Sequence, residues 1–107
     1  MTTEELFDAV KKWGRDKGIN NPTVQFAKIN EEVGELAHEL VRGYCGGYSG
    51  TVPSQETVDA IGDILVTVII FADIIGVEPL EALQLSYDTI KGRKGVTKDG
   101  SFIKEDE

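Results

Sequence analysis

The segment from residue 56 to residue 75 places acidic side chains directly before an apolar run. The stretch 64–75 is almost entirely apolar and is preceded by three acids, Glu56, Asp59 and Asp63. At about 100° per residue, Asp59 and Asp63 share one helical stripe with Ile70, which the pattern places in the core. The run is too short to span a bilayer and is typical of a helix inside a bundle. The chain must therefore bury a helix that carries carboxylates beside the core.

A second acidic cluster lies on the helical pattern before it. One arc of that helical pattern is polar and consists of Gln25, Lys28, Glu32, Glu35 and Glu39. The neighbouring arc is apolar and consists of Ile29, Val33, Leu36 and Leu40. Ionised carboxylates are costly beside a core, and Lys28 is the only basic residue within either cluster's stretch. If the two helices pack side by side, the acids face one another across a groove. We expect Mg²⁺ or Mn²⁺ there, held by Glu32, Glu35, Asp59 and Asp63. The alternative is an ordinary solvated helix face.

Length and charge narrow the class of protein. With 107 residues the chain can form one domain with a modest core, and further copies would add to what one chain buries. The formal net charge of −8 predicts no nucleic acid and no membrane as partner, because both attract basic surfaces. The single cysteine, Cys45, and an acidic start without an apolar signal core predict a cytoplasmic protein.

Capping and stop residues divide the chain into four helices. The patterns predict helices from Thr2 to about Gly18, from Asn21 to near Gly43, from Ser54 to Gly76 and from Pro79 to about Gly92. A plain interhelical loop is predicted for the glycine-rich residues 43–50, and a small hairpin around Asp99 and Gly100. We therefore predict an all-α, four-helix bundle-like fold, with a helical domain at 1–93 and a C-terminal hairpin or extended tail at 94–107.

Four stretches, taken in order, carry a recognisable pattern through most of the chain. They are Trp13, the stretch 25–37 with its motif Glu31-Glu32-x-x-Glu35, the stretch 59–65 and the stretch 90–95. In this order they resemble the MazG-like all-α nucleoside triphosphate pyrophosphohydrolases. One position departs from that family, because Ala60 stands three residues before Asp63, where the family has an acid. We favour Asp59 as its replacement and keep Glu56 as a second-rank ligand.

The resemblance implies a reaction, a cofactor and an assembly. The reaction is hydrolysis of a nucleoside triphosphate between its α and β phosphates, to the monophosphate and pyrophosphate, and it requires Mg²⁺ or Mn²⁺. The family forms homodimers or homotetramers. The implied catalytic residues are Glu31, Glu32, Glu35 and Asp63, with Glu31 positioning or deprotonating the attacking water.

Substrate contacts follow from the same resemblance. The candidate phosphate-binding residues are basic: Lys28, Lys91, Arg93 and Lys94. The last three also suit the dipole at a helix C-terminus, and that interpretation stays open beside the first. Gln25 and Trp13 are candidates for binding the base, although a lone tryptophan on a helix packs in a core more often.

Two other classes of protein compete with this interpretation. Glu35-x-x-His38 is the step from which di-iron carboxylate helix bundles are built, although His38 lies about 120° from Glu32 around the helix. A non-enzymatic acidic helical interaction protein would carry the same carboxylates only for solubility. The latter predicts that Mg²⁺ hardly changes thermal stability.

Overall fold

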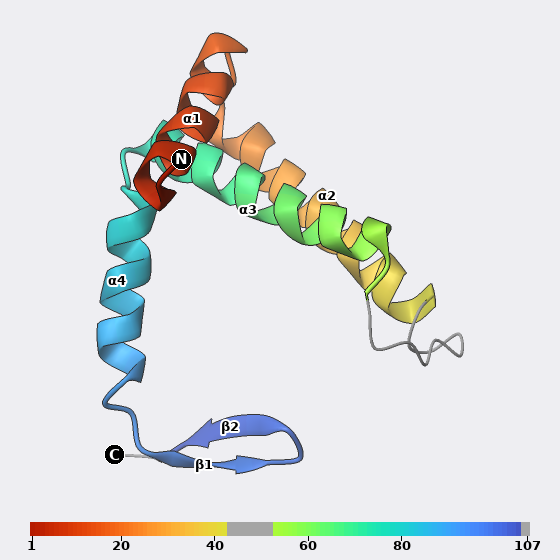
Figure 1. The fold of residues 1–107 in the computed structure, drawn as a ribbon, viewed down its shortest axis with the longest axis vertical. Coiled ribbons are helices and arrows are strands. Elements are labelled where there is room, and N and C mark those ends of the chain that lie inside the picture. The colour runs from red at the N-terminus through yellow and green to blue at the C-terminus, as the bar shows by residue number, and fades with distance from the viewer. Residues whose placement is uncertain (43–52, 106–107) are drawn as a thin grey trace. The chain divides into compact units, whose positions relative to one another are not determined.

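The computed structural model describes residues 1–42 and 53–105, which form four helices and a two-stranded hairpin (Figure 1). The elements are α1 Thr3–Asp16, α2 Pro22–Leu40, α3 Gln55–Ile75, α4 Pro79–Ile90, β1 Gly95–Lys98 and β2 Ser101–Lys104. The predicted all-α fold with a C-terminal hairpin is confirmed. The glycine-rich loop at 43–50, with Cys45, lies outside the described residues. The chain forms two compact units, Met1–Val77 and Glu78–Glu107, while the domain boundary predicted after residue 93 stays a prediction.

Helices α1, α2 and α3 begin at the capping residues that the sequence predicts. Thr2 and Glu5 form a reciprocal capping box, in which the Glu5 N–H donates to Thr2 Oγ1 at 3.1 Å. Asn21 Oδ1 accepts from two backbone N–H groups before α2, and Ser54 Oγ accepts from the Thr57 N–H before α3. Each cap satisfies donors that the first helical turn would otherwise leave unpaired.

Three helices end two or three residues earlier than the sequence predicts, among them α2, which ends at Leu40 rather than near Gly43. Helix α1 ends at Asp16, because a turn follows in which Gly18 adopts a φ of 73° and its N–H donates to the Arg15 carbonyl. Helix α4 ends at Ile90, two residues before Gly92. Helix α3 stops where predicted, at Gly76, whose φ of 78° suits a residue without a Cβ.

Helix α3 is the element on which the first unit is built. Both α1 and α2 pack on α3, and α2 runs beside it in the opposite direction (Figure 1). Its buried residues are Ala60, Thr67, Ile69, Ile70 and Ala72. Five other apolar residues of α3 remain 41% to 57% exposed: Val58, Ile61, Leu65, Val68 and Ile75. A single chain thus leaves part of this apolar helix uncovered.

The second unit contains α4 and the predicted hairpin. Strands β1 and β2 are antiparallel, with Val96 opposite Ile103, and Asp99 and Gly100 between them both have positive φ. A Cβ at Gly95 would lie 2.2 Å from the Ile103 carbonyl oxygen, so the hairpin requires glycine there.

Within residues 1–42 and 53–105, no single helix is both long and apolar enough to cross a membrane.

Candidate metal centre

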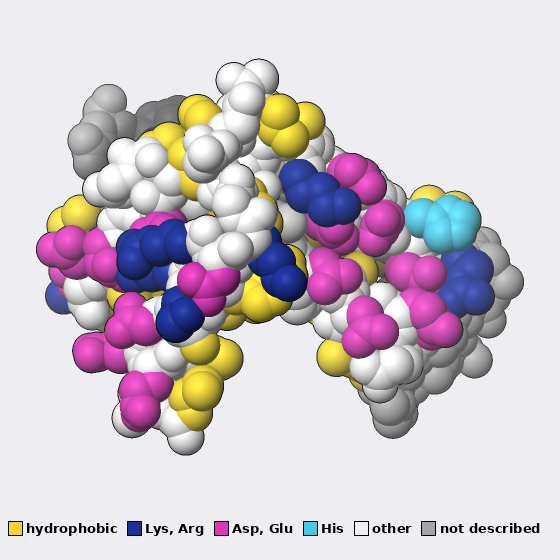
Figure 2. Space-filling model, turned by 90° about the horizontal axis from the view of Figure 1, so that it is seen from above, with side chains coloured by type: hydrophobic (Ala, Val, Ile, Leu, Met, Phe, Trp, Pro, Cys, Tyr) yellow, Lys and Arg dark blue, Asp and Glu magenta, His cyan; other side chains and the backbone are white. Residues whose placement is uncertain are grey.

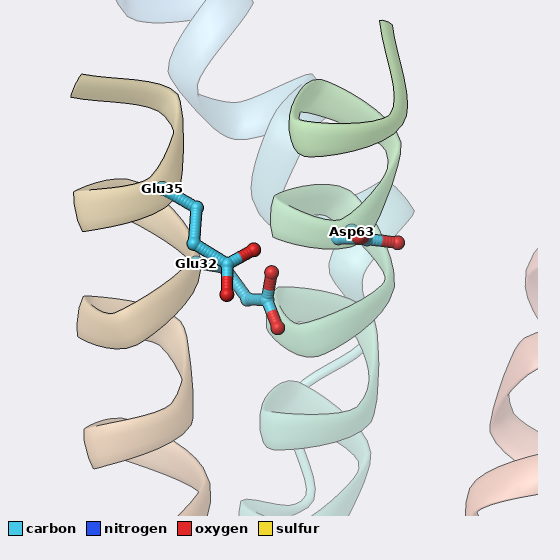
Figure 3. A group of neighbouring side chains, drawn as sticks. All are labelled: Glu32, Glu35 and Asp63. Atoms are coloured by element: carbon cyan, nitrogen blue, oxygen red, sulfur yellow. The ribbon is translucent and has the colours of Figure 1, made fainter. Parts of the chain in front are cut away.

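Three carboxylates meet between α2 and α3. Glu32 and Glu35 extend from α2 toward α3, which carries Asp63 (Figure 3). One oxygen from each residue lies within 4.8 Å of the others. Glu32 and Glu35 are three residues apart, so they share one face of α2. The structure thus brings together three of the four residues predicted as metal ligands, and we refer to them as the carboxylate cluster.

Glu32 is the most constrained member of this cluster. Its residue is only 6% exposed, and its Oε2 atom has no hydrogen-bond partner within the described part of the chain. Its Oε1 atom lies 3.3 Å from Lys28 Nζ. A buried carboxylate oxygen without a partner is costly, and a cation relieves that cost. The donor atoms here are all carboxylate oxygens, which suit hard divalent cations such as Mg²⁺ or Mn²⁺.

Charge repulsion within the cluster changes the acidity of Glu35. The negative charge of Glu32, and then a hydrogen bond to its carboxyl group, raise the pKa of Glu35 above its ordinary value of 4.5. Hydrogen bonds to Glu32 and Glu31 raise the pKa of Lys28. One lysine therefore faces several acids, and the charge around the cluster remains negative.

The fourth ligand is not brought into the cluster. Asp59 Oδ1 instead accepts a hydrogen bond from Gln55 Nε2 at 2.8 Å, one turn earlier on the same helix. Glu56 Oε2 lies 3.9 Å from Arg42 Nη2. Both acids border the same groove as the cluster, and their roles as ligands stay predictions.

Two grooves adjoin the cluster. The acidic groove, of about 490 Å³, is lined by residues that include Glu31, Glu35, His38, Glu56, Asp59 and Asp63. The apolar groove, of about 460 Å³, is lined by residues that include Trp13, Ile19, Gln25, Lys28, Val66 and Ile70, together with Asp63. Asp63 therefore lies on both grooves. Figure 2 shows one face of the molecule on which Asp and Glu side chains gather.

The two predicted base-binding residues lie on the apolar groove. Gln25 is buried, and its Nε2 donates to the Thr67 carbonyl at 3.2 Å, which holds the amide in one orientation. Trp13 is 52% exposed, so it is not a core residue of the first unit. Lys17 Nζ lies 5.9 Å from the centre of the Trp13 ring.

The remaining candidates lie elsewhere. His38 borders the acidic groove and is not a member of the carboxylate cluster. Lys91, Arg93 and Lys94 belong to the second unit, where Lys91 Nζ lies 2.9 Å from Asp88 Oδ1. Their part in phosphate binding stays a prediction.

Sequence reasoning missed an ion pair between α1 and α3. Arg15 donates from Nε to Asp73 Oδ2 at 2.8 Å and from Nη2 to Asp73 Oδ1 at 2.5 Å. The pair holds the pKa of Asp73 below its ordinary value of 3.8, mainly through the hydrogen bond from Arg15. The partners are 58 residues apart in the sequence, so no local sequence pattern predicts the pair. The nearest signal is Gly14, a glycine inside a helical pattern.

Comparisons with known proteins support the fold. No family model matches the sequence, and no curated protein matches it. Two solved structures are similar over 88% of this chain. One is a Bacillus-conserved MazG protein, a nucleotide pyrophosphohydrolase, with 94% of it covered, 23% identity and a TM-score of 0.69. The other is the candidate pyrophosphatase YpjD from Bacillus subtilis, with 97% covered, 20% identity and a TM-score of 0.68. They confirm the predicted MazG-like all-α fold.

Proposed function

We propose that this protein is a metal-dependent nucleoside triphosphate pyrophosphohydrolase that forms a nucleoside monophosphate and pyrophosphate. One observation carries the proposal: three carboxylates lie together, and one of them, the buried Glu32, has an oxygen without a hydrogen-bond partner among the described residues. Such an arrangement is costly unless a cation completes it. The similar folds of a nucleotide pyrophosphohydrolase and a candidate pyrophosphatase support this reaction class by analogy of fold.

The two grooves suggest how a nucleotide would lie. Asp63 borders both grooves. A nucleotide whose triphosphate lies at the carboxylate cluster can therefore place its nucleoside in the apolar groove. The apolar groove has a half-exposed indole, Trp13, and an oriented amide, Gln25, which suit the face and the edge of a base. We assign the phosphates to the acidic side and the base to the apolar side.

The carboxylate cluster and two neighbouring residues have different roles in this scheme. Glu32, Glu35 and Asp63 hold Mg²⁺ or Mn²⁺, which supplies Lewis acidity and neutralises phosphate charge. Glu31 borders the acidic groove and is 60% exposed at its side chain, so it can accept a proton from an attacking water. Lys28, which pairs with Glu31 and Glu32, adds positive charge on the apolar groove beside the cluster.

The experiment that tests this proposal is a substrate screen. The purified protein is incubated with the common ribo- and deoxyribonucleoside triphosphates and Mg²⁺ or Mn²⁺, and phosphorus NMR identifies the products. We expect monophosphate and pyrophosphate from at least one substrate, and none after removal of the metal with a chelator. Orthophosphate with a diphosphate would contradict cleavage between the α and β phosphates.

The same protein preparation separates the competing classes. The di-iron alternative predicts bound iron and a near-ultraviolet charge-transfer band, whereas the cluster itself offers only carboxylate oxygens. The interaction-protein alternative predicts no hydrolysis and no change in melting temperature with Mg²⁺. Either result would replace the proposed activity.

The basic residues after α4 are proposed to contact phosphate. If they do, Lys91→Ala and Lys94→Ala should each lower kcat/KM by about tenfold and leave the melting temperature nearly unchanged. If these residues only interact favourably with the dipole at the C-terminus of α4, the two substitutions leave catalysis unaffected and lower stability slightly. Asp88→Asn, which removes the acid beside Lys91, is a matched control that should not weaken phosphate binding.

Assembly with further copies is proposed on the exposed apolar side of α3. The spacing of Val58, Ile61, Leu65 and Val68 repeats in steps of three and four residues, as in helices that pack on a partner helix. A homodimer or homotetramer would cover this stripe. Sedimentation equilibrium is expected to find such an oligomer at micromolar concentration, and a stable folded monomer would contradict it.

A further inference from the structure

The last turn of α1 fits closely against α3. Gly14 is buried, and a Cβ at this position would lie 3.1 to 3.3 Å from three atoms of the Ile70 side chain. Helices approach this closely only where one of them lacks a side chain. The contact fixes how near α1 comes to α3 at this point.

The ion pair between Arg15 and Asp73 is next to this contact and joins the same two helices. Two parallel hydrogen bonds join the guanidinium to the carboxylate, at 2.8 and 2.5 Å. A bidentate pair fixes orientation as well as distance, which a single hydrogen bond does not. We refer to Gly14, Arg15, Ile70 and Asp73 as the α1–α3 seam.

The seam shares residues with a wall of the apolar groove. Trp13 immediately precedes Gly14, and its side chain lines the groove. Ile70, which Gly14 contacts, lines the same groove. A rotation of α1 about the Gly14 contact would therefore move Trp13 relative to the part of α3 that forms the rest of the wall.

We propose that Arg15 and Asp73 are positioning residues for nucleoside binding: their ion pair orients α1 so that Trp13 forms the wall of the apolar groove. The inference rests on the proposed function, since the ligand is a nucleotide. Neither residue lines the apolar groove or touches the carboxylate cluster. Their effect on a bound nucleotide is exerted through Trp13.

A purely stabilising role would give a different result. The Arg15 side chain is 68% exposed, so the ion pair by itself is expected to contribute little to stability. A small loss of stability does not change affinity for a ligand when the protein stays folded. A positioning role predicts weaker nucleoside binding with unchanged chemistry, which is a rise in KM at constant kcat.

The test compares Asp73→Asn and Arg15→Gln with a matched control on the same helix. The control is Asp16→Asn, which removes the ion pair of Asp16 with Lys12 within α1. We expect KM for the preferred triphosphate to rise by about fivefold or more in both seam variants, with kcat within about twofold. Asp16→Asn should leave both constants unchanged, and the exchange Arg15→Asp with Asp73→Arg should restore KM.

A second readout follows the indole directly. Trp13 is the only tryptophan, so its fluorescence reports ligand in the apolar groove. Titration with AMP, GMP, CMP and dTMP should quench the wild-type signal, and the seam variants should need about fivefold more ligand. The binding constant of Mg²⁺, measured by calorimetry, should stay the same in all variants because the carboxylate cluster is intact.

Several outcomes overturn the proposal. Unchanged KM and quenching in both seam variants would show that the pair does not position Trp13. Equal losses of kcat and Mg²⁺ affinity would mean that the seam supports the whole unit. If none of the four monophosphates quenches the fluorescence of the wild type, Trp13 does not contact the nucleoside and the proposal is wrong. A wild type that hydrolyses no triphosphate refutes the proposed function, yet the quenching test still decides the role of the seam. If Asp73→Asn does not fold, Arg15→Gln, at a more exposed position, decides it.

Discussion

Two acids of helix α3, Asp73 and Asp63, contact neighbouring helices, and their partners differ in charge. Asp73, 17% exposed at its side chain, faces α1 and accepts both hydrogen bonds from Arg15. Asp63 faces α2, where it meets Glu32 and Glu35, and the nearby Lys28 pairs with Glu31 and Glu32 instead. One contact is balanced in charge, whereas the other brings together three carboxylates.

The difference indicates which contact serves structure and which serves binding. An acid matched by an arginine needs no further partner, so the seam can be complete in the protein alone. Carboxylates that repel one another are tolerated where a cation joins them in the working protein. The contrast gives opposite expectations for the removal of each acid, and the following experiments test them.

The largest effect is expected from Asp63→Asn. Loss of one carboxylate from the cluster should lower metal-dependent hydrolysis by about a hundredfold or more. The metal-free protein should keep its melting temperature or gain a little, because repulsion within the cluster is relieved. Activity assays and calorimetric melting of the same preparation measure both quantities.

Asp73→Asn is the counterpart on the other face of α3. It should keep kcat and slightly lower the melting temperature, since it leaves the Arg15 guanidinium without its carboxylate partner. Full activity in Asp63→Asn, or a large loss of kcat in Asp73→Asn, would reverse the assignment of the two contacts.

The next effect is stabilisation by metal. Mg²⁺ at about a hundred times its dissociation constant should stabilise the wild type by about 2.7 kcal/mol. Thermal melting with and without Mg²⁺ measures it, and Asp63→Asn should show little shift. An equal shift in both proteins would place the bound ion elsewhere.

A smaller difference is expected between the two remaining acids of the acidic groove. Asp59→Asn should reduce activity by about tenfold, whereas Glu56→Gln should change it by about twofold or less, because Asp59 is the favoured fourth ligand. Steady-state kinetics with saturating Mg²⁺ decides the order. The opposite order would make Glu56 the ligand and extend the metal site toward Arg42.

The smallest effect concerns acid pH. The pKa of Asp73 is held below its ordinary value of 3.8, so its pair with Arg15 stabilises the fold above that pH and is lost as the pH falls through the folded-state pKa. Between about pH 5 and pH 3, wild type should lose up to about 1 kcal/mol more stability than Asp73→Asn. Urea unfolding at both pH values measures this. Equal losses would show that the pair contributes nothing to stability.

Local signals explain why so much of the fold could be predicted. The capping box of Thr2 and Glu5, the cap at Asn21 and the stop at Gly76 act within a few residues of where they occur. Their hydrogen bonds are therefore visible in the sequence. The C-terminal ends of α1, α2 and α4 differ from the predicted ends by two or three residues, because the last helical turn competes with the turn that follows it.

Only those features of the site that depend on the spacing of residues along one helix could be predicted from the sequence. The pattern placed Glu32 beside the core and paired it with Glu35, and it put Asp63 on the stripe of Ile70. It could not decide whether Asp59 joins them, because a step of four residues keeps one face but shifts the carboxylate by a full turn along the helix. The Arg15–Asp73 pair depends on how α1 crosses α3, which only tertiary packing determines.

The arrangement around α3 has a consequence for how such a sequence can vary. One helix supplies an acid to the cluster, an acid to the seam and an apolar stripe that stays exposed in the single chain. Few positions along it can change without affecting one of these faces. Amino-acid replacements should therefore be tolerated on the outer surface of α1 far more readily than along α3, and a mutational scan would trace the central helix as a continuous band of intolerance.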